Sequence, residues 1–234
     1  MHLKLTLKCI AAAALLASLA SCSIGEVRLK GPVDARMLER AKSIPVGSEV
    51  HLESMGGEEA YGVEIARLLR SKNADTRVDK YCASACVGIL LAGNKKYVSR
   101  GAVIVLHNNA QSWLLVDQSV LTPLERRKIK ANVDREVAFH REINVDPRYL
   151  GCINQWMRFG EAEFSRVRDD GSIGSIRLQT RLTGVLPSRE LWEAMGVSGI
   201  QSYPDADALV QNVVRVFPKG SFIIGRPERC PIAR

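Results

Sequence analysis

The chain has 234 residues and a formal net charge of +8, with 46% hydrophobic and 25% charged residues. This balance is that of a globular domain with enough apolar side chains for one sizeable core. The lysines and arginines are scattered and aromatic residues make up only 6%. We therefore expect no nucleic-acid partner, and the positive charge favours at most an anionic surface such as a membrane.

The first 22 residues have the pattern of an export signal. Two lysines and no acid occupy the first eight residues, and an apolar run covers residues 9–20. The run is too short for a permanent transmembrane helix, which needs about 20 apolar residues. It ends in Leu19-Ala20-Ser21-Cys22, which resembles the bacterial lipobox, in which the cysteine becomes lipid-modified and the new N-terminus.

We expect residues 1–21 to be a lipoprotein signal peptide and Cys22 to carry the lipid. The mature protein would then be anchored to a membrane of the cell envelope. Ser23 favours the outer membrane and its periplasmic face, because a residue other than Asp after the lipidated cysteine goes with outer-membrane sorting in many Gram-negative lipoproteins. An ordinary secretory signal and a buried N-terminal helix are the alternatives.

The mature chain begins with a predicted tether and docking segment over residues 22–43, followed by one domain over 44–234. From there the pattern alternates between strands and helices, which predicts an α/β fold with largely parallel pairing. A helix near 188–195 and a strand near 222–224 follow a stretch without a clear period. The other predicted strands are 50–54, 76–81, 97–99 and 102–106, and the other predicted helices are 58–71, 83–92 and 122–143.

Three short motifs in this pattern are suited to acyl-transfer chemistry. A predicted strand runs into Gly56-Gly57, Ser84 occupies a turn of small residues between a strand and a helix, and His107 follows an apolar strand. Glycine frees a backbone N–H for an oxyanion, a helix N-terminus favours negative charge, and a His at a strand end is rigidly held. Taken singly, each has a structural alternative: a turn, a helix cap, or a packed histidine.

The order of the motifs resembles the Clp protease proteolytic subunit and its relatives in the ClpP/crotonase superfamily. The resemblance covers residues 49–109, with Ser54-Met55-Gly56-Gly57 at the position of the family's Ser-Pro-Gly-Gly and Leu91-Ala92-Gly93 at the end of the helix after the serine. The Cys-x-Ser-x-Cys form around Ser84 is similar to the exported Clp-like branch, and residues 187–197 resemble a late helix. The resemblance implies a repeated β-β-α spiral with a helical C-terminal part.

By this resemblance Ser84 is the nucleophile and His107 its base. The backbone N–H groups of Gly57 or Gly56 and of Ala85 would bind the oxyanion. The family's third residue is an Asp, whereas the alignment places Thr183 or Gly184 there, so a dyad, a carbonyl, the Thr183 hydroxyl or another acid would have to orient the histidine. The upstream acids considered for this role are Asp170, Asp169 and Asp146.

The resemblance implies an envelope lipoprotein with a serine peptidase or esterase domain that acts through an acyl-enzyme on Ser84. No metal, nucleotide or other cofactor is expected, and the chain has no Walker-type loop. Expected partners are a peptide or protein substrate, the membrane through the lipid anchor, and further copies of the chain. The alternatives are a catalytically inactive Clp-like lipoprotein that binds or scaffolds, and a crotonase-type acyl-thioester enzyme.

Four cysteines remain once Cys9 leaves with the signal and Cys22 is lipidated. An even number in an oxidising compartment predicts disulfides among Cys82, Cys86, Cys152 and Cys230, with three connectivities open. A bridge between the first two would stiffen the turn that holds Ser84. Zinc binding is the rival interpretation. Of the remaining histidines, His51 is expected to be structural and His140 to lie on the surface.

Overall fold

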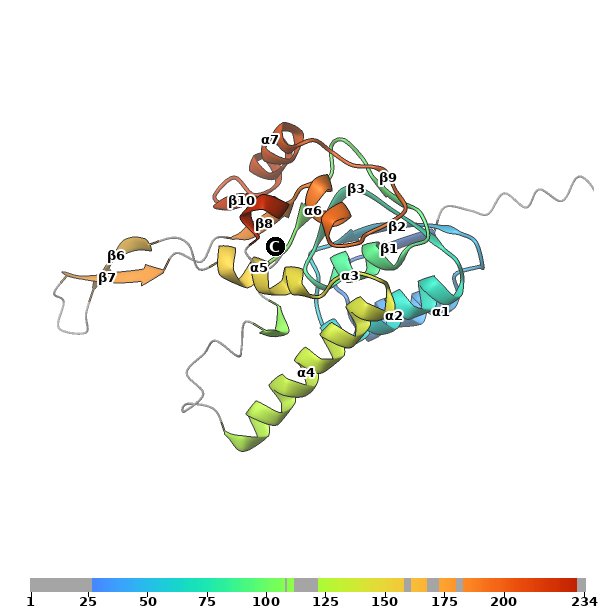
Figure 1. Ribbon diagram of the computed structural model, residues 1–234, viewed down its shortest axis with the longest axis horizontal. Helices are drawn as coiled ribbons and strands as arrows, with labels where there is room; N and C mark the ends of the chain where they lie inside the picture. Colours follow the sequence, from blue (N-terminus) through green and yellow to red (C-terminus); the bar gives the residue numbers. More distant parts are fainter. Residues whose placement is uncertain are drawn as a thin grey trace, which may run out of the picture.

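The computed structural model describes residues 27–107, 109–111, 122–157, 161–167, 173–179 and 183–230 (Figure 1). The predicted signal peptide, the predicted lipidation site Cys22 and the candidate acids Asp169 and Asp170 lie outside these residues.

The main sheet has six strands, and each pair of neighbouring strands runs parallel. Its order is β1-β2-β3-β4-β9, and β5 pairs with the second half of β3 beyond the end of β4. The expected mixed α/β architecture with a parallel sheet is therefore confirmed. The strands are β1 (Val27–Lys30), β2 (Glu49–Ser54), β3 (Asp75–Ala83), β4 (Lys96–Val98), β5 (Val103–Val105) and β9 (Ile200–Ser202).

Helices α1 (Ala35–Lys42), α2 (Glu59–Ser71) and α3 (Ala85–Ala92) form a layer against the sheet, with α2 packed between the other two (Figure 1). Helix α3 has almost no polar surface, because seven of its eight residues are buried. The alternating strand residues Val50 and Leu52 point into this core. Apolar burial on one sheet face is the main force that joins the two layers.

The residues between these alternating positions carry charges. In β2 the partly exposed Glu49 receives two hydrogen bonds from Arg77 on β3, at 2.6 and 3.1 Å. His51 lies between Glu49 and Asp79, with its Nδ1 2.8 Å from the Asp79 carboxylate. His51 is thus part of a row of polar and charged side chains on this face of the sheet.

The C-terminal part is mostly helical and carries two small sheets. Strands β8 (Gly184–Pro187) and β10 (Phe222–Gly225) pair in parallel, and β6 (Glu161–Val167) and β7 (Ile173–Gln179) pair antiparallel. Figure 1 shows α4 running away from the body of the molecule at its N-terminal end. The helices are α4 (Pro123–Glu142), α5 (Arg148–Trp156), α6 (Arg189–Ala194), α7 (Ala206–Val216) and the short 3₁₀ helix η3 (Pro227–Arg229).

Residues 27–43 lie within the fold, although we expected a tether and docking segment over 22–43. β1 pairs with β2, and Leu29, Val33 and Met37 are each only 1% exposed in the same core as the rest of the domain. These residues therefore share one core with the predicted domain, and the boundary at position 44 stays a prediction. In the described part of the chain, no helix is both long and apolar enough to span a bilayer.

Candidate active site

The two glycines after β2 lie directly against Ser84. Gly56 has φ +95°, a conformation that favours glycine, and its N–H donates to the Ser54 hydroxyl at 3.0 Å. A Cβ at Gly56 would stand 2.5 Å from the Ser84 Cβ and 2.8 Å from the Ala83 carbonyl oxygen. A side chain at position 56 would therefore displace the serine.

Gly57 forms an isolated β-bridge with Val33, and its N–H points to the side away from Val33. Val33 pairs in parallel with Gly57 by donating to the Gly56 carbonyl and accepting from the Glu58 N–H, both at 2.9 Å. Successive peptide groups in extended chain alternate sides. The Gly57 N–H therefore faces the opposite side, where β3 and Ser84 follow in the sheet order.

Ser84 stands between β3 and α3 in an uncommon backbone conformation. Its φ is +56° and its ψ −130°, a strained combination for a residue with a side chain. The Ser84 N–H donates to the Val105 carbonyl at 3.1 Å. Its hydroxyl makes no capping hydrogen bond to α3, so the alternative of an N-cap serine is wrong. The residue is half-buried, and the first N–H of α3, that of Ala85, follows it directly.

A disulfide closes this turn on both sides of the serine. Cys82 at the end of β3 is bonded to Cys86 in the first turn of α3, with 5.4 Å between their Cα atoms, and both are buried. The second disulfide joins Cys152 on α5 to Cys230 near the C-terminus. Two of the three open connectivities are thereby excluded. All four cysteines are in disulfides, which argues against the zinc interpretation.

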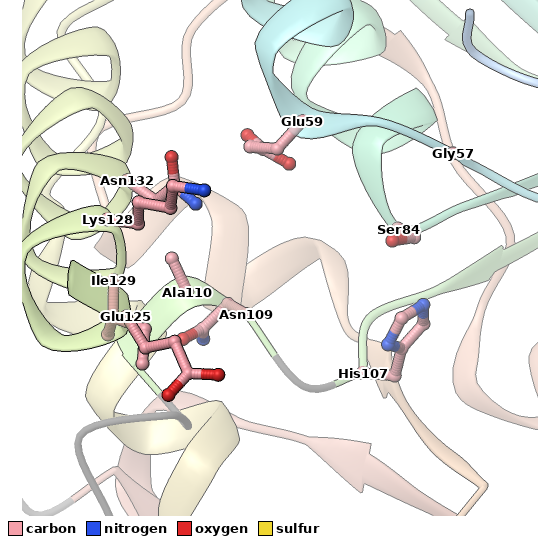
Figure 2. Close-up of a pocket in the computed structure, with 10 residues that line it drawn as sticks. All are labelled: Gly57, Glu59, Ser84, His107, Asn109, Ala110, Glu125, Lys128, Ile129 and Asn132. Carbon is pink, nitrogen blue, oxygen red and sulfur yellow. The ribbon is translucent and has the colours of Figure 1, made fainter. Parts of the chain in front are cut away.

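His107 follows β5 and is positioned by a link to β8. Leu106 donates to the Val185 carbonyl at 2.9 Å, and the Val185 N–H donates back at 2.7 Å. The Val105 carbonyl, which accepts from the Ser84 N–H, and the Leu106 N–H belong to the same peptide group, so this link directly adjoins the hydrogen bond that holds Ser84. Figure 2 shows the Ser84 hydroxyl and the His107 ring at the same cavity, with one ring nitrogen on the side toward Ser84.

The cavity has a volume of about 500 Å³ and lies between the sheet edge and helix α4. Ser84, His107 and Gly57 line one side (Figure 2), and the exposed face of α4 lines the other. This space is large enough for several residues of an extended peptide. The remaining lining residues are Glu59, Asn109, Ala110, Glu125, Lys128, Ile129 and Asn132.

The structure does not bring an acid from the predicted set to the cavity within its described residues. Asp146 accepts from the backbone N–H and the guanidinium of Arg148, at 2.9 and 2.7 Å. The Thr183 hydroxyl accepts from the Ser221 N–H at 3.0 Å, and Thr183 is not among the cavity-lining residues. Thr183 and Asp170 therefore stay predictions for the orienting group.

A buried polar group behind the cavity was not foreseen from the sequence. Glu136 on α4 is 4% exposed and accepts from the Ala110 N–H at 3.1 Å, and burial raises its pKa to about 8. His140, expected at the surface, is 3% exposed, so that expectation is wrong. Its Nδ1 lies 2.7 Å from the Glu136 carbonyl and its Nε2 2.6 Å from the Tyr149 hydroxyl.

Burial lowers the pKa of His140 to about 4, so the ring is neutral at pH 7. A neutral ring that donates from Nδ1 to the carbonyl must accept from the Tyr149 hydroxyl at Nε2. Glu136 and His140 are four residues apart and therefore share one helix face. This spacing was the signal in the sequence that could have indicated a polar cluster on α4.

Among the described residues, no three His, Cys, Asp or Glu side chains gather in a way that could hold a metal ion.

Comparisons with known proteins find a likeness among solved structures. No protein-family model matches the chain, and no curated protein does. Among solved structures, the chain is similar to a mutant of ClpP1 from Listeria monocytogenes, with 16% identity and a TM-score of 0.43, over 79% of this chain and 94% of that one.

Proposed function

We propose that the chain is a serine hydrolase that cleaves peptide bonds through an acyl-enzyme on Ser84, with His107 as the general base. The observation that carries this proposal is the strained, uncapped Ser84 at the mouth of α3, facing a cavity that it shares with His107. A strained residue in a cavity persists only where the surrounding structure holds it, and such residues cluster at active sites.

The proposed reaction uses groups that lie on one side of the cavity. His107 takes the hydroxyl proton of Ser84 while the serine oxygen attacks the carbonyl carbon of the substrate. The N–H groups of Gly57 and Ala85 stabilise the oxyanion. His107 then gives the proton to the leaving amine, and a water molecule, activated by the same ring, releases the acid and restores the serine.

The test is covalent labelling with a fluorophosphonate, followed by intact mass and peptide mapping. We expect one adduct on Ser84, complete loss in Ser84→Ala, and strongly slowed labelling in His107→Ala. Ser71→Ala, which changes an exposed serine at the end of α2, is the matched control and should label normally. A folded wild-type protein that never labels would favour the inactive, partner-binding alternative.

We further propose that the protein is exported and lipid-anchored at Cys22, on the envelope side of a membrane. The leader pattern supports this proposal, and so do the two disulfides, because disulfides persist in oxidising compartments. Metabolic labelling with a palmitate analogue should mark the wild type and not Cys22→Ala. An unprocessed N-terminus in the wild type would contradict the proposed lipid anchor. Self-association, implied by the family resemblance, is measured by sedimentation of the detergent-solubilised protein.

A further inference from the structure

Glu59 brings a carboxylate into the cavity that the proposed nucleophile lines. It is the first residue of α2, two positions after the proposed oxyanion donor Gly57, and it lines the same cavity as Ser84. Figure 2 shows its side chain extending into the space between Ser84 and helix α4. A group bonded to Ser84 would therefore share the cavity with this carboxylate.

The Glu59 carboxylate makes no hydrogen bond or ion pair with the described residues. Burial raises its pKa, and only the more distant charge of Arg135 opposes that effect. Lys128 lines the same cavity from α4, but its side chain is exposed and forms no ion pair with Glu59. A desolvated carboxylate without a partner is costly, and a cation that docks beside it recovers that cost.

The wall behind Glu59 holds a second acid, Glu136, whose pKa is raised to about 8, so it adds negative charge only at alkaline pH. Glu136 is buried there and acts on Glu59 as a like charge when both are ionised. The Ala110 N–H satisfies one oxygen of Glu136. Glu125 also lines the cavity, but its carboxylate accepts from the N–H and the hydroxyl of Thr122, so among the described lining residues Glu59 has the carboxylate without a hydrogen bond. Its place at the start of a helix also keeps it ionisable, because a helix N-terminus favours negative charge.

We propose that Glu59 selects substrates by their charge: the part of the cavity that it lines takes a cationic group near the scissile bond, such as a lysine or arginine side chain or a peptide amino terminus. This inference rests on the proposed hydrolase function of Ser84. It assigns Glu59 a role in specificity, while bond cleavage uses Ser84 and His107.

The test compares two fluorophosphonates that differ only in the end of a short alkyl chain, one carrying an ammonium group and the other a neutral methyl group. In the wild type, we expect the cationic probe to label Ser84 faster by about tenfold or more, the range of a desolvated charge pair. Glu59→Gln should abolish this preference by slowing the cationic probe toward the rate of the neutral one. Glu58→Gln, which changes the exposed neighbour on the same turn, is the matched control and should keep the preference.

Two outcomes would overturn the inference in different ways. Equal rates for the two probes, or a preference that survives in Glu59→Gln, would remove the role of Glu59 and leave the hydrolase intact. Failure of the neutral probe to label the wild type at Ser84 would remove the hydrolase itself, and the specificity with it. High salt gives a further check, because it should reduce only the cationic preference.

Discussion

Residues 49–107 and the described residues of the C-terminal part are held together by contacts of different range. In the first region, strands pair with strands nearby in the chain, and the disulfide around Ser84 spans a sequence separation of 4. In the second, the disulfide from α5 to the C-terminus spans 78. Asn212 on α7 donates to the carbonyls of Arg100 and Ala102 at 2.6 and 3.2 Å.

The candidate site lies where the two regions meet. Short-range contacts hold the nucleophile, because Ser84 is placed by β3, α3 and the nearby β5. A long-range contact holds the base, because the chain entering His107 is bonded to Val185 on β8. The opposite wall is α4, which is buried only near its C-terminal end. Local stability and correct closure of the site should therefore be separable by mutation.

The two disulfides offer the largest contrast. Replacing Cys152 and Cys230 by serine should lower the free energy of unfolding by about 4 kcal/mol, because a long loop gains much entropy when the crosslink is lost. The same change at Cys82 and Cys86 should cost only about 2 kcal/mol by that loop-length estimate. Loss of the Cys82–Cys86 disulfide should nevertheless slow labelling of Ser84 more than loss of the Cys152–Cys230 disulfide does. Urea unfolding and labelling rates measure the two effects, and a parallel ranking in both assays would contradict the separation.

Gly56→Ala should have the next largest effect and lower the free energy of unfolding by about 3 kcal/mol, because it combines a left-handed φ with an overpacked contact. It should also abolish fluorophosphonate labelling, because the new Cβ would stand 2.5 Å from that of Ser84. Gly47→Ala is the control: its φ is +75°, but nothing lies within 4 Å of the added Cβ. It should lose stability and keep labelling. Normal labelling of Gly56→Ala would show that the glycine contact does not position the serine.

Glu136→Gln tests the buried acid behind the cavity. The folded state raises the pKa of Glu136 from 4.5 to about 8. The folded protein thus keeps a proton that the unfolded chain releases, so this group favours folding below about pH 4.5 and loses that contribution as the pH rises toward 8. Glutamine can still accept from Ala110 and carries no charge.

The variant should therefore be more stable than the wild type by about 2 kcal/mol near pH 8.5, with the gain shrinking as the pH falls toward 5. Thermal unfolding across this range measures the difference. A gain that does not vary with pH would mean that the carboxyl does not titrate between the two states.

Thr122→Ala should have the smallest effect. Thr122 caps α4 by accepting from the Glu125 N–H at 3.2 Å, while the Glu125 carboxylate accepts from the Thr122 N–H at 2.7 Å. Loss of such a capping box costs about 1 kcal/mol. Amide exchange should rise in the first turns of α4 and stay unchanged in α3. Faster exchange in α3 would show that the two regions are coupled more tightly than their contacts suggest.

Much of the first region could be predicted from the sequence because its signals are local. The apolar spacing of α2 and the small residues of α3 each lie within one element. In the second region, the Thr-Pro start of α4 is a local signal of the same kind. The predicted members of the site, Ser84, His107 and the glycine pair, lie at the ends of such elements. Their meeting at one cavity follows from parallel pairing, which brings the same ends of the strands to one edge.

The rest depended on contacts that local patterns do not contain. His140 was expected at the surface because α4 is polar over most of its length, and only its last turns meet the core. α7 was not predicted, although the sequence held a local signal for it: Asp205 as its N-cap, and Leu209 and Val213 on one face. The group that orients His107 could not be predicted, because the position aligned with the family's acid holds Thr183 or Gly184.

The bridge between Val33 and Gly57 fixes the direction of the Gly57 N–H, the proposed oxyanion donor. The segment around Val33 therefore acts as a template for this part of the site. Peptide groups alternate in direction, so a slip of one residue there would turn the Gly57 N–H away from Ser84 and present a carbonyl of a neighbouring residue instead. Proteolytic trimming past residue 33 would take the template away altogether. The segment nearest the expected membrane anchor thus also determines whether an N–H or a C=O group faces Ser84.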